Sequence, residues 1–226
     1  MKTKLLNTEF IPSASNAAQG TMVVLHGLGD CKESYRWLPQ ALEMPFLNYI
    51  LVDAPDRYFD GYSWFNIDED LEDPTTIARS RTLLFNFLEQ LEQDGYPPQK
   101  TILFGFSQGC LMSWEVGIRY HKTLAGIIGI SGWASRKSGT LDCLNETSRS
   151  QRFLITHGIY DPLLPVEIVK TQIHELKSKG LKIDYHELQK EHTILGEIEI
   201  PLYKDFINKV LIDEPVYANN NRCKRQ

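Results

Sequence analysis

The stretch that decides the fold is Thr101–Gly109, which reads TILFGFSQG. Its first half is an apolar run that predicts a buried strand, and the pattern Gly-x-Ser-x-Gly follows at once. A sharp strand-to-helix turn of this kind lifts the hydroxyl of Ser107 above the end of a sheet. In such a turn, a side chain at Gly105 or Gly109 would collide with the neighbouring strand and helix. The motif alone is weak, so its meaning depends on the rest of the chain.

Six apolar runs along the chain predict strands. Several of them are apolar at consecutive positions, as in strands that a parallel sheet buries on both faces. The runs are Thr21–His26, Asn48–Asp53, Lys100–Phe106, Leu124–Ile130, Arg152–His157 and Leu181–Leu188. We also expect a short edge strand at Glu9–Ile11.

Helical patterns fill the gaps between these strands. The clearest begins at Asp73-Pro74, an N-cap residue followed by proline at the first helical position, and ends before Asp94-Gly95. The other helices are expected at Glu33–Glu43, Gln108–His121, Pro165–Lys179 and Gly196–Leu211. The alternation predicts an α/β fold, a three-layer sandwich with a mostly parallel central sheet and no large lid. The long connection Ser131–Gln151 is expected to be surface loop only.

Length and composition limit the classes of protein. We expect one domain over residues 1–226, with a core at about 9–211 and a polar tail at 213–226. The net charge of -5 argues against nucleic acid as a partner. The chain has no 18-residue apolar run and no signal-peptide pattern. Four scattered cysteines without metal spacing predict free thiols, a cytoplasmic location and no metal or other cofactor: Cys31, Cys110, Cys143 and Cys223.

A serine nucleophile needs a base within hydrogen-bond reach and an acid that orients the base. When a serine stands at a strand-to-helix turn of this kind, the acid and then the histidine follow it along the chain. Asp161 comes directly after the strand Arg152–His157, at the sheet edge where open α/β sheets place their sites. Asp before Pro also starts turns, which is the alternative for Asp161. The order of Ser107, Asp161 and His192 favours catalysis.

Two histidines compete for the role of base. His186 alternates with apolar neighbours inside the strand Leu181–Leu188, so it is most simply a strand side chain. His192 lies beyond that strand, in a loop that can carry an imidazole over the sheet end. We therefore predict His192 as the base.

The negative charge that develops on an attacked carbonyl oxygen needs two backbone N–H donors. One is expected from Gln108, the residue after the serine. Leu28 is the candidate for the other, because the glycine-rich segment His26–Asp30 follows the first long strand. His26 itself is interpreted as a buried, hydrogen-bonded histidine that holds this turn.

An acyl chain needs an apolar groove beside the serine. The candidates follow strands or lie in loops near the expected sheet end: Trp64, Phe65, Trp133, Leu163 and Leu164. Ordinary core packing is the alternative for at least half of them. Trp64 and Phe65 are the favoured contacts, because the residues around them have loop composition.

Four segments in the right order resemble the phospholipase/carboxylesterase family, whose best-known members are the acyl-protein thioesterases, also called lysophospholipases. They are LHGLGD at residues 25–30, Ser63-Trp64-Phe65, GFSQG at residues 105–109, and HG followed by DPLLP at residues 157–165. The similarity covers about residues 9–211. It implies a lidless α/β-hydrolase without a cofactor. By position, Ser107 matches the family's nucleophile, Asp161 its acid, and Leu28 and Gln108 its oxyanion donors.

The chain departs from the family pattern at two places. Lys190-Glu191 precede His192 where the family usually has glycine or a short apolar residue, so Glu191 is expected to influence the rim of the site. Cys110 and Leu111 replace the small residues that usually follow the elbow, and we expect them to narrow the pocket.

Taken together, the residues predict a serine hydrolase that cleaves carboxylic esters or thioesters through an acyl-enzyme on Ser107. The alternative within this chemistry is a long-chain lysophospholipase or acyl-protein thioesterase, acting on a lysolipid or an acylated protein. A peptidase and a non-catalytic binding protein with the same fold are further alternatives, because a fold does not fix a function. We expect a monomer or a homodimer.

Overall fold

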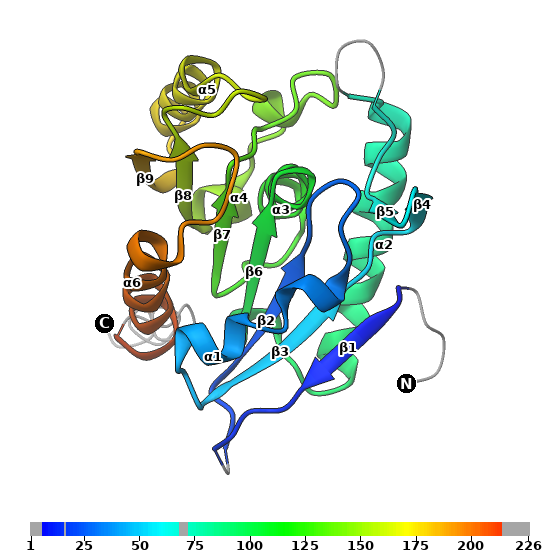
Figure 1. The fold of residues 1–226 in the computed structure, drawn as a ribbon, viewed down its shortest axis with the longest axis vertical. Coiled ribbons are helices and arrows are strands. Elements are labelled where there is room, and N and C mark those ends of the chain that lie inside the picture. The colour runs from blue at the N-terminus through cyan, green and yellow to red at the C-terminus, as the bar shows by residue number, and fades with distance from the viewer. Residues whose placement is uncertain (1–5, 16, 68–71, 214–226) are drawn as a thin grey trace, which may run out of the picture.

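A computed structural model describes residues 6–15, 17–67 and 72–213. Seven strands form one twisted sheet in the order β1-β3-β2-β6-β7-β8-β9 (Figure 1). Strand β1 runs antiparallel to β3, and all other neighbours in this sheet are parallel. The strands are β1 (Thr8–Ile11), β2 (Gly20–Leu25), β3 (Leu47–Val52), β6 (Thr101–Phe106), β7 (Gly126–Ile130), β8 (Arg152–Gly158) and β9 (Lys182–Leu188). The predicted mostly parallel α/β architecture is confirmed.

Helices cover both faces of this sheet. The core on one face contains apolar side chains of α2 (Pro74–Gln93), α3 (Gln108–Arg119) and α5 (Val166–Ser178). The core on the other contains side chains of α1 (Leu38–Leu42), α6 (Gly196–Asn208) and the π-helical turn Lys209–Asp213. No helix among residues 6–15, 17–67 and 72–213 is long and apolar enough to cross a membrane.

Strand β2 shows why consecutive apolar residues belong in such a sheet. Val23 and Leu25 pack into the core beneath α2 and α3, whereas Met22 and Val24 pack into the core beneath α1 and α6. Because side chains alternate between the faces of a strand, an apolar residue is needed at every position when both faces are covered.

Two short elements replace the single helix expected at Glu33–Glu43. A 3₁₀ turn occupies Lys32–Tyr35, and α1 begins afterwards with Pro39 in its first turn. Proline has no backbone N–H, so a helix running through residue 39 would lose one hydrogen bond, whereas a helix starting there loses none.

Two regions that the sequence suggested were loop carry structure. Strands β4 (Asp56–Tyr58) and β5 (Gly61–Ser63) pair as a small antiparallel hairpin. The connection after β7 holds a 3₁₀ turn at Thr140–Asp142 and helix α4 (Glu146–Ser150). The expectation of surface loop only for that connection is therefore wrong: Thr140, Leu141 and Ser148 are buried there. Elements of three to five residues are too short to show a hydrophobic period.

Candidate active site

The turn between β6 and α3 is tight and strained at the serine. Ser107 has φ 53° and ψ -115°, a region that residues other than glycine rarely occupy. A Cβ on Gly105 would lie 2.2 Å from the carbonyl oxygen of Gly109, and one on Gly109 would lie 2.2 Å from that of Leu25. Only glycine permits this close packing of helix on sheet. The Ser107 N–H donates to the carbonyl of Ile130 at 2.9 Å, which ties the turn to the end of β7.

The structure brings Ser107, His192 and Asp161 together at the carboxyl edge of the sheet. His192 Nε2 lies 2.9 Å from Ser107 Oγ, and His192 Nδ1 lies 2.7 Å from Asp161 Oδ2. A carboxylate only accepts hydrogen bonds, so Nδ1 carries the proton and donates it to Asp161. The lone pair of Nε2 is then directed at the serine hydroxyl, as a general base requires.

The loop after β8 holds the Asp161 carboxylate in place. Its Oδ1 accepts the backbone N–H groups of Leu163 at 3.0 Å and of Leu164 at 2.9 Å, which leaves Oδ2 for His192. Nearby, His157 Nε2 donates to the Leu164 carbonyl at 2.9 Å. Burial lowers the pKa of His157, so this imidazole is neutral and does not compete for the carboxylate as a cation would.

His186, the competing histidine, lies away from the serine. Its Nε2 is 3.1 Å from Asp184 Oδ1, and both residues lie on strand β9. This matches the interpretation of His186 as a strand side chain.

Leu28 and Gln108 line the same cavity as Ser107 and His192. Gln108 is the first residue of α3, where backbone N–H groups have no partner inside the helix and the helix dipole favours negative charge. The segment that carries Leu28 is fixed by His26, whose Nε2 accepts the Ala54 N–H at 3.0 Å. His26 Nδ1 therefore holds the proton and donates to the Gly27 carbonyl at 2.6 Å.

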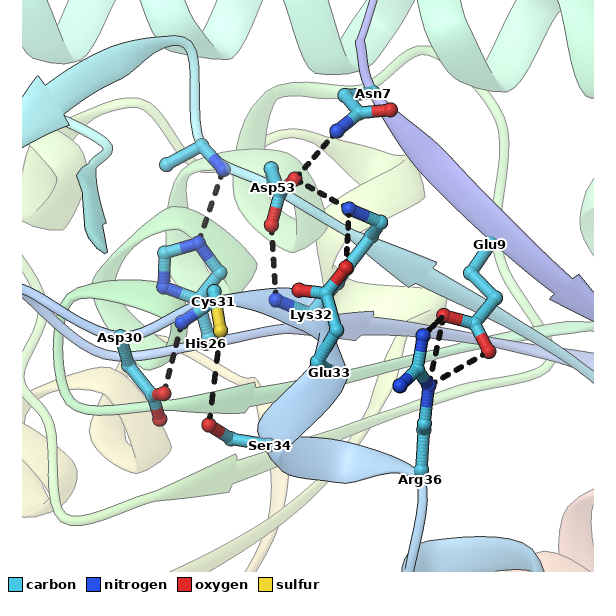
Figure 2. A network of polar contacts seen from close by, with 11 residues as sticks. Asn7, Glu9, His26, Asp30, Cys31, Lys32, Glu33, Ser34, Arg36 and Asp53 are labelled. Atoms are coloured by element: carbon cyan, nitrogen blue, oxygen red, sulfur yellow. Dashed lines mark hydrogen bonds and ion pairs between the residues drawn. The ribbon is translucent and has the colours of Figure 1, made fainter. Parts of the chain in front are cut away.

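A polar network anchors the chain just beyond this segment (Figure 2). Asp53, buried at the end of β3, accepts the backbone N–H of Lys32 at 2.9 Å and its ammonium at 2.7 Å. Asn7 on the other side donates to the same carboxylate at 2.6 Å. Burial lowers the pKa of His26, which keeps that ring neutral inside the network. The Leu28 segment is thus clamped to the neighbouring strand.

The cavity beside Ser107 has a volume of about 410 Å³ and lies between the loops at this sheet edge. Trp133, Leu163 and Leu164 line it, as the sequence suggested. The remaining lining residues are Gly27, Asp30, Ile67 and Phe106. Sequence reasoning did not select these four; Phe106, beside the serine in the elbow motif, was the one with a usable signal.

Trp64 and Phe65 are fully buried and do not line this cavity, so the prediction that they face a ligand does not match the structure. Trp64 Nε1 donates to the His26 carbonyl at 2.9 Å and so braces the Leu28 segment. Phe65 packs edge-on against Trp133, with ring centroids 6.3 Å apart. Their loop composition reflects the β4–β5 hairpin, which folds back under the cavity.

The Gln108 side chain joins this hairpin to the elbow. Its Oε1 accepts the Trp64 N–H at 3.0 Å and the Ser63 hydroxyl at 3.2 Å, and its Nε2 donates to the Phe65 carbonyl at 3.0 Å. One residue therefore offers its backbone N–H to the cavity and its side chain to the supporting layer.

Cys110 and Leu111 pack into the core beneath α3 and are not part of the cavity wall, so the expected narrowing of the pocket does not occur through direct lining. Glu191 is exposed. Among the residues that the structure describes, no cluster of three or more His, Cys, Asp or Glu side chains could hold a metal ion.

A strained serine between a parallel strand and a helix, with an imidazole and a carboxylate aligned behind it, is the arrangement of an α/β-hydrolase. A model of the phospholipase/carboxylesterase family matches residues 6–211. The chain belongs to this family and is a hydrolase of the carboxylic ester or thioester class.

Known proteins with similar sequence or structure agree with this assignment. Acyl-protein thioesterase 1 of Schizosaccharomyces pombe is 28% identical over 221 residues, covering 90% of this chain and 96% of the relative. Acyl-protein thioesterase 1 of Yarrowia lipolytica is 28% identical over 195 residues, covering 78% and 85%. The solved structure of esterase PE8 has a TM-score of 0.80 and 27% identity, covering 91% of this chain and 99% of that chain. The fold also matches acyl-protein thioesterase 2 of Zea mays, with a TM-score of 0.73, 21% identity, and coverage of 91% and 99%.

Proposed function

We propose that the chain hydrolyses acyl esters or thioesters through an acyl-enzyme on Ser107. His192 Nε2 takes the hydroxyl proton as Oγ attacks the carbonyl carbon, and then gives that proton to the leaving alcohol or thiol. Water enters next, His192 removes one of its protons, and the acid product leaves as Oγ regains a proton. Asp161 holds the imidazole in the required tautomer and stabilises its charged form. The observation that carries this proposal is the hydrogen-bonded chain from Ser107 Oγ to His192 to Asp161.

The backbone N–H groups of Leu28 and Gln108 are proposed to hold the oxyanion. Both residues line the cavity at the serine, and each is fixed by contacts outside the cavity. Donors that are held in place before the reaction need no reorganisation when the charge develops, and losing one donor costs about 10²–10³ in rate.

The acyl group is proposed to occupy the cavity lined by Trp133, Leu163 and Leu164. Leu163 is 63% exposed, so the cavity has an apolar rim that the alkyl chain of a substrate can cover. A long-chain substrate, either a lysolipid or an acylated protein, is the more specific form of this proposal. The names of the fungal relatives favour acylated proteins.

The first test is substitution of the triad residues. Ser107→Ala and His192→Ala should abolish turnover of p-nitrophenyl esters and labelling by a fluorophosphonate, which reacts only with an activated serine. Ser113→Ala on the same helix and His186→Ala on β9 are matched controls that should keep both. Turnover retained in Ser107→Ala would refute the assignment of the nucleophile.

The second test measures substrate class. A chain-length series of acyl groups, prepared both as oxygen esters and as thioesters, separates a long-chain enzyme from a short-chain esterase. We expect kcat/KM to rise with chain length until the cavity is filled. A flat series would contradict the assignment of this cavity to the acyl chain.

A cytoplasmic location is also proposed. Three cysteines in the described part of the chain, Cys31, Cys110 and Cys143, are free thiols, as expected in a reducing compartment. The proposed assembly is a monomer or a homodimer, which light scattering of the purified protein would distinguish.

A further inference from the structure

A buried ion pair lies directly behind His192. Lys190 Nζ is 2.7 Å from Glu199 Oε1, and both side chains have 0% exposure. Burying two charges is expensive, and a buried pair often adds nothing to stability compared with apolar residues of similar volume. Its place beside the proposed base therefore calls for another explanation.

The pair is bonded to the chain on both sides of His192. The Lys190 ammonium donates to the carbonyl of Thr193 at 2.8 Å, one residue after the histidine. Glu199 Oε2 accepts the N–H of Leu195 at 2.5 Å, three residues after it. These contacts fix the path of the loop through its carbonyl and amide groups.

The same pair is attached to the sheet and to helix α6. The Thr156 hydroxyl, on strand β8, donates to Glu199 Oε1 at 2.5 Å, and Glu199 itself belongs to the first turn of α6. Lys190 is also held through its backbone, since its carbonyl accepts the Tyr160 N–H at 3.1 Å. A Cβ on Gly158 would lie 2.2 Å from that carbonyl oxygen, so the histidine loop packs tightly on the aspartate loop.

We propose that Lys190 and Glu199 are positioning residues for His192, holding the imidazole in register with Ser107 and Asp161. Neither touches the substrate in this proposal. They act through the loop backbone, whose displacement would lengthen the hydrogen bond between Nε2 and Ser107 Oγ. The proposal rests on the function proposed for His192.

The test is the double variant Lys190→Met/Glu199→Gln. It removes both charges together, and the glutamine oxygen can still accept from Leu195 and Thr156. Only the tie from the ammonium to the Thr193 carbonyl is lost. A matched control is Arg81→Met/Glu115→Gln, which removes a second ion pair, 2.6 Å long with Glu115 fully buried, between α2 and α3.

The expected result for the Lys190/Glu199 variant is a fall in kcat and in the rate of fluorophosphonate labelling of about 10- to 100-fold, with KM within about twofold. The control variant should keep kcat, whatever its melting temperature. Unchanged kcat in a folded Lys190/Glu199 variant would overturn the proposal, as would an equal loss of kcat in both double variants.

Two further variants keep the outcome interpretable. If the double variant does not fold, Thr156→Val removes one hydrogen bond to Glu199 without changing any charge. It should lower kcat at constant KM, and an unchanged kcat would overturn the proposal. His192→Ala, assayed alongside, separates the two levels: if it is inactive and the Lys190/Glu199 variant is fully active, only the positioning role fails.

Discussion

The backbone strain at Ser107 predicts that Ser107→Gly is more stable than Ser107→Ala. Both variants lose the hydroxyl that bonds to His192, so this loss cancels in the comparison. A side chain held at φ 53° and ψ -115° costs about 1–3 kcal/mol, and glycine avoids that cost. Glycine also gains conformational freedom in the unfolded chain, which lowers stability by about 0.4–1 kcal/mol. The glycine variant should therefore be ahead by about 1 kcal/mol.

The difference is measurable by calorimetry or urea unfolding. For a chain of this size, about 1 kcal/mol corresponds to a shift of roughly 2–4 °C in Tm. Ser113, in the interior of α3, supplies the control, because glycine in a helix is about 0.8–1 kcal/mol worse than alanine. The sign of the glycine–alanine difference should thus reverse between residues 107 and 113. If glycine is the less stable variant at both positions, the elbow is not strained and the reasoning fails.

Three further predictions concern the frame around the site. Gly109→Ala places a Cβ 2.2 Å from the Leu25 carbonyl oxygen, so it should cost about 3 kcal/mol or more, and an unchanged Tm would contradict this close approach. Lys32→Met leaves the Asp53 carboxylate buried without its cation and should cost about 3–5 kcal/mol in urea unfolding. Adding Asp53→Asn should recover most of that loss, and a double variant no more stable than the single would argue against the ion pair. Burial lowers the pKa of His26 and of His157, so the unfolded chain binds protons below about pH 6.5 that the folded chain does not. Stability should therefore fall as pH drops below 6.5, by up to about 1.4 kcal/mol per pH unit for each histidine, and NMR titration at pH 6.5 of both rings would refute this.

The parts of the fold that were predictable from sequence are those that bury apolar side chains over six or more residues. Strands β2 and β6 and helix α2 each carry such a pattern, and the observed bounds differ from the predicted ones by a residue or two. The order of Ser107, Asp161 and His192 was also visible, because each follows a strand and the carboxyl ends of parallel strands lie at one edge.

Features that depend on contacts between distant short segments were not predictable. Trp64 has the flanking composition of a loop residue, and only the β4–β5 hairpin shows that it points inward, against the His26 carbonyl. Lys190 in the sequence is a charged residue beside another one, Glu191, which predicts a solvated loop. The structure buries Lys190 because Glu199, nine residues later, supplies the countercharge. No pattern of local spacing records that pairing.

Catalysis at this site would require four groups from four different loops to stay within a few tenths of an ångström of one another, and loops are the most mobile part of an α/β fold. The chain answers this with buried polar contacts rather than with a lid. Asp53 and His26 fix the segment of Leu28, two backbone N–H groups fix Asp161, and the Lys190–Glu199 pair fixes the loop of His192. Each of these contacts lies beneath the cavity and leaves the cavity itself apolar. Substrate preference can then change through the cavity residues Trp133 and Leu163 without disturbing the geometry of the proposed catalytic groups.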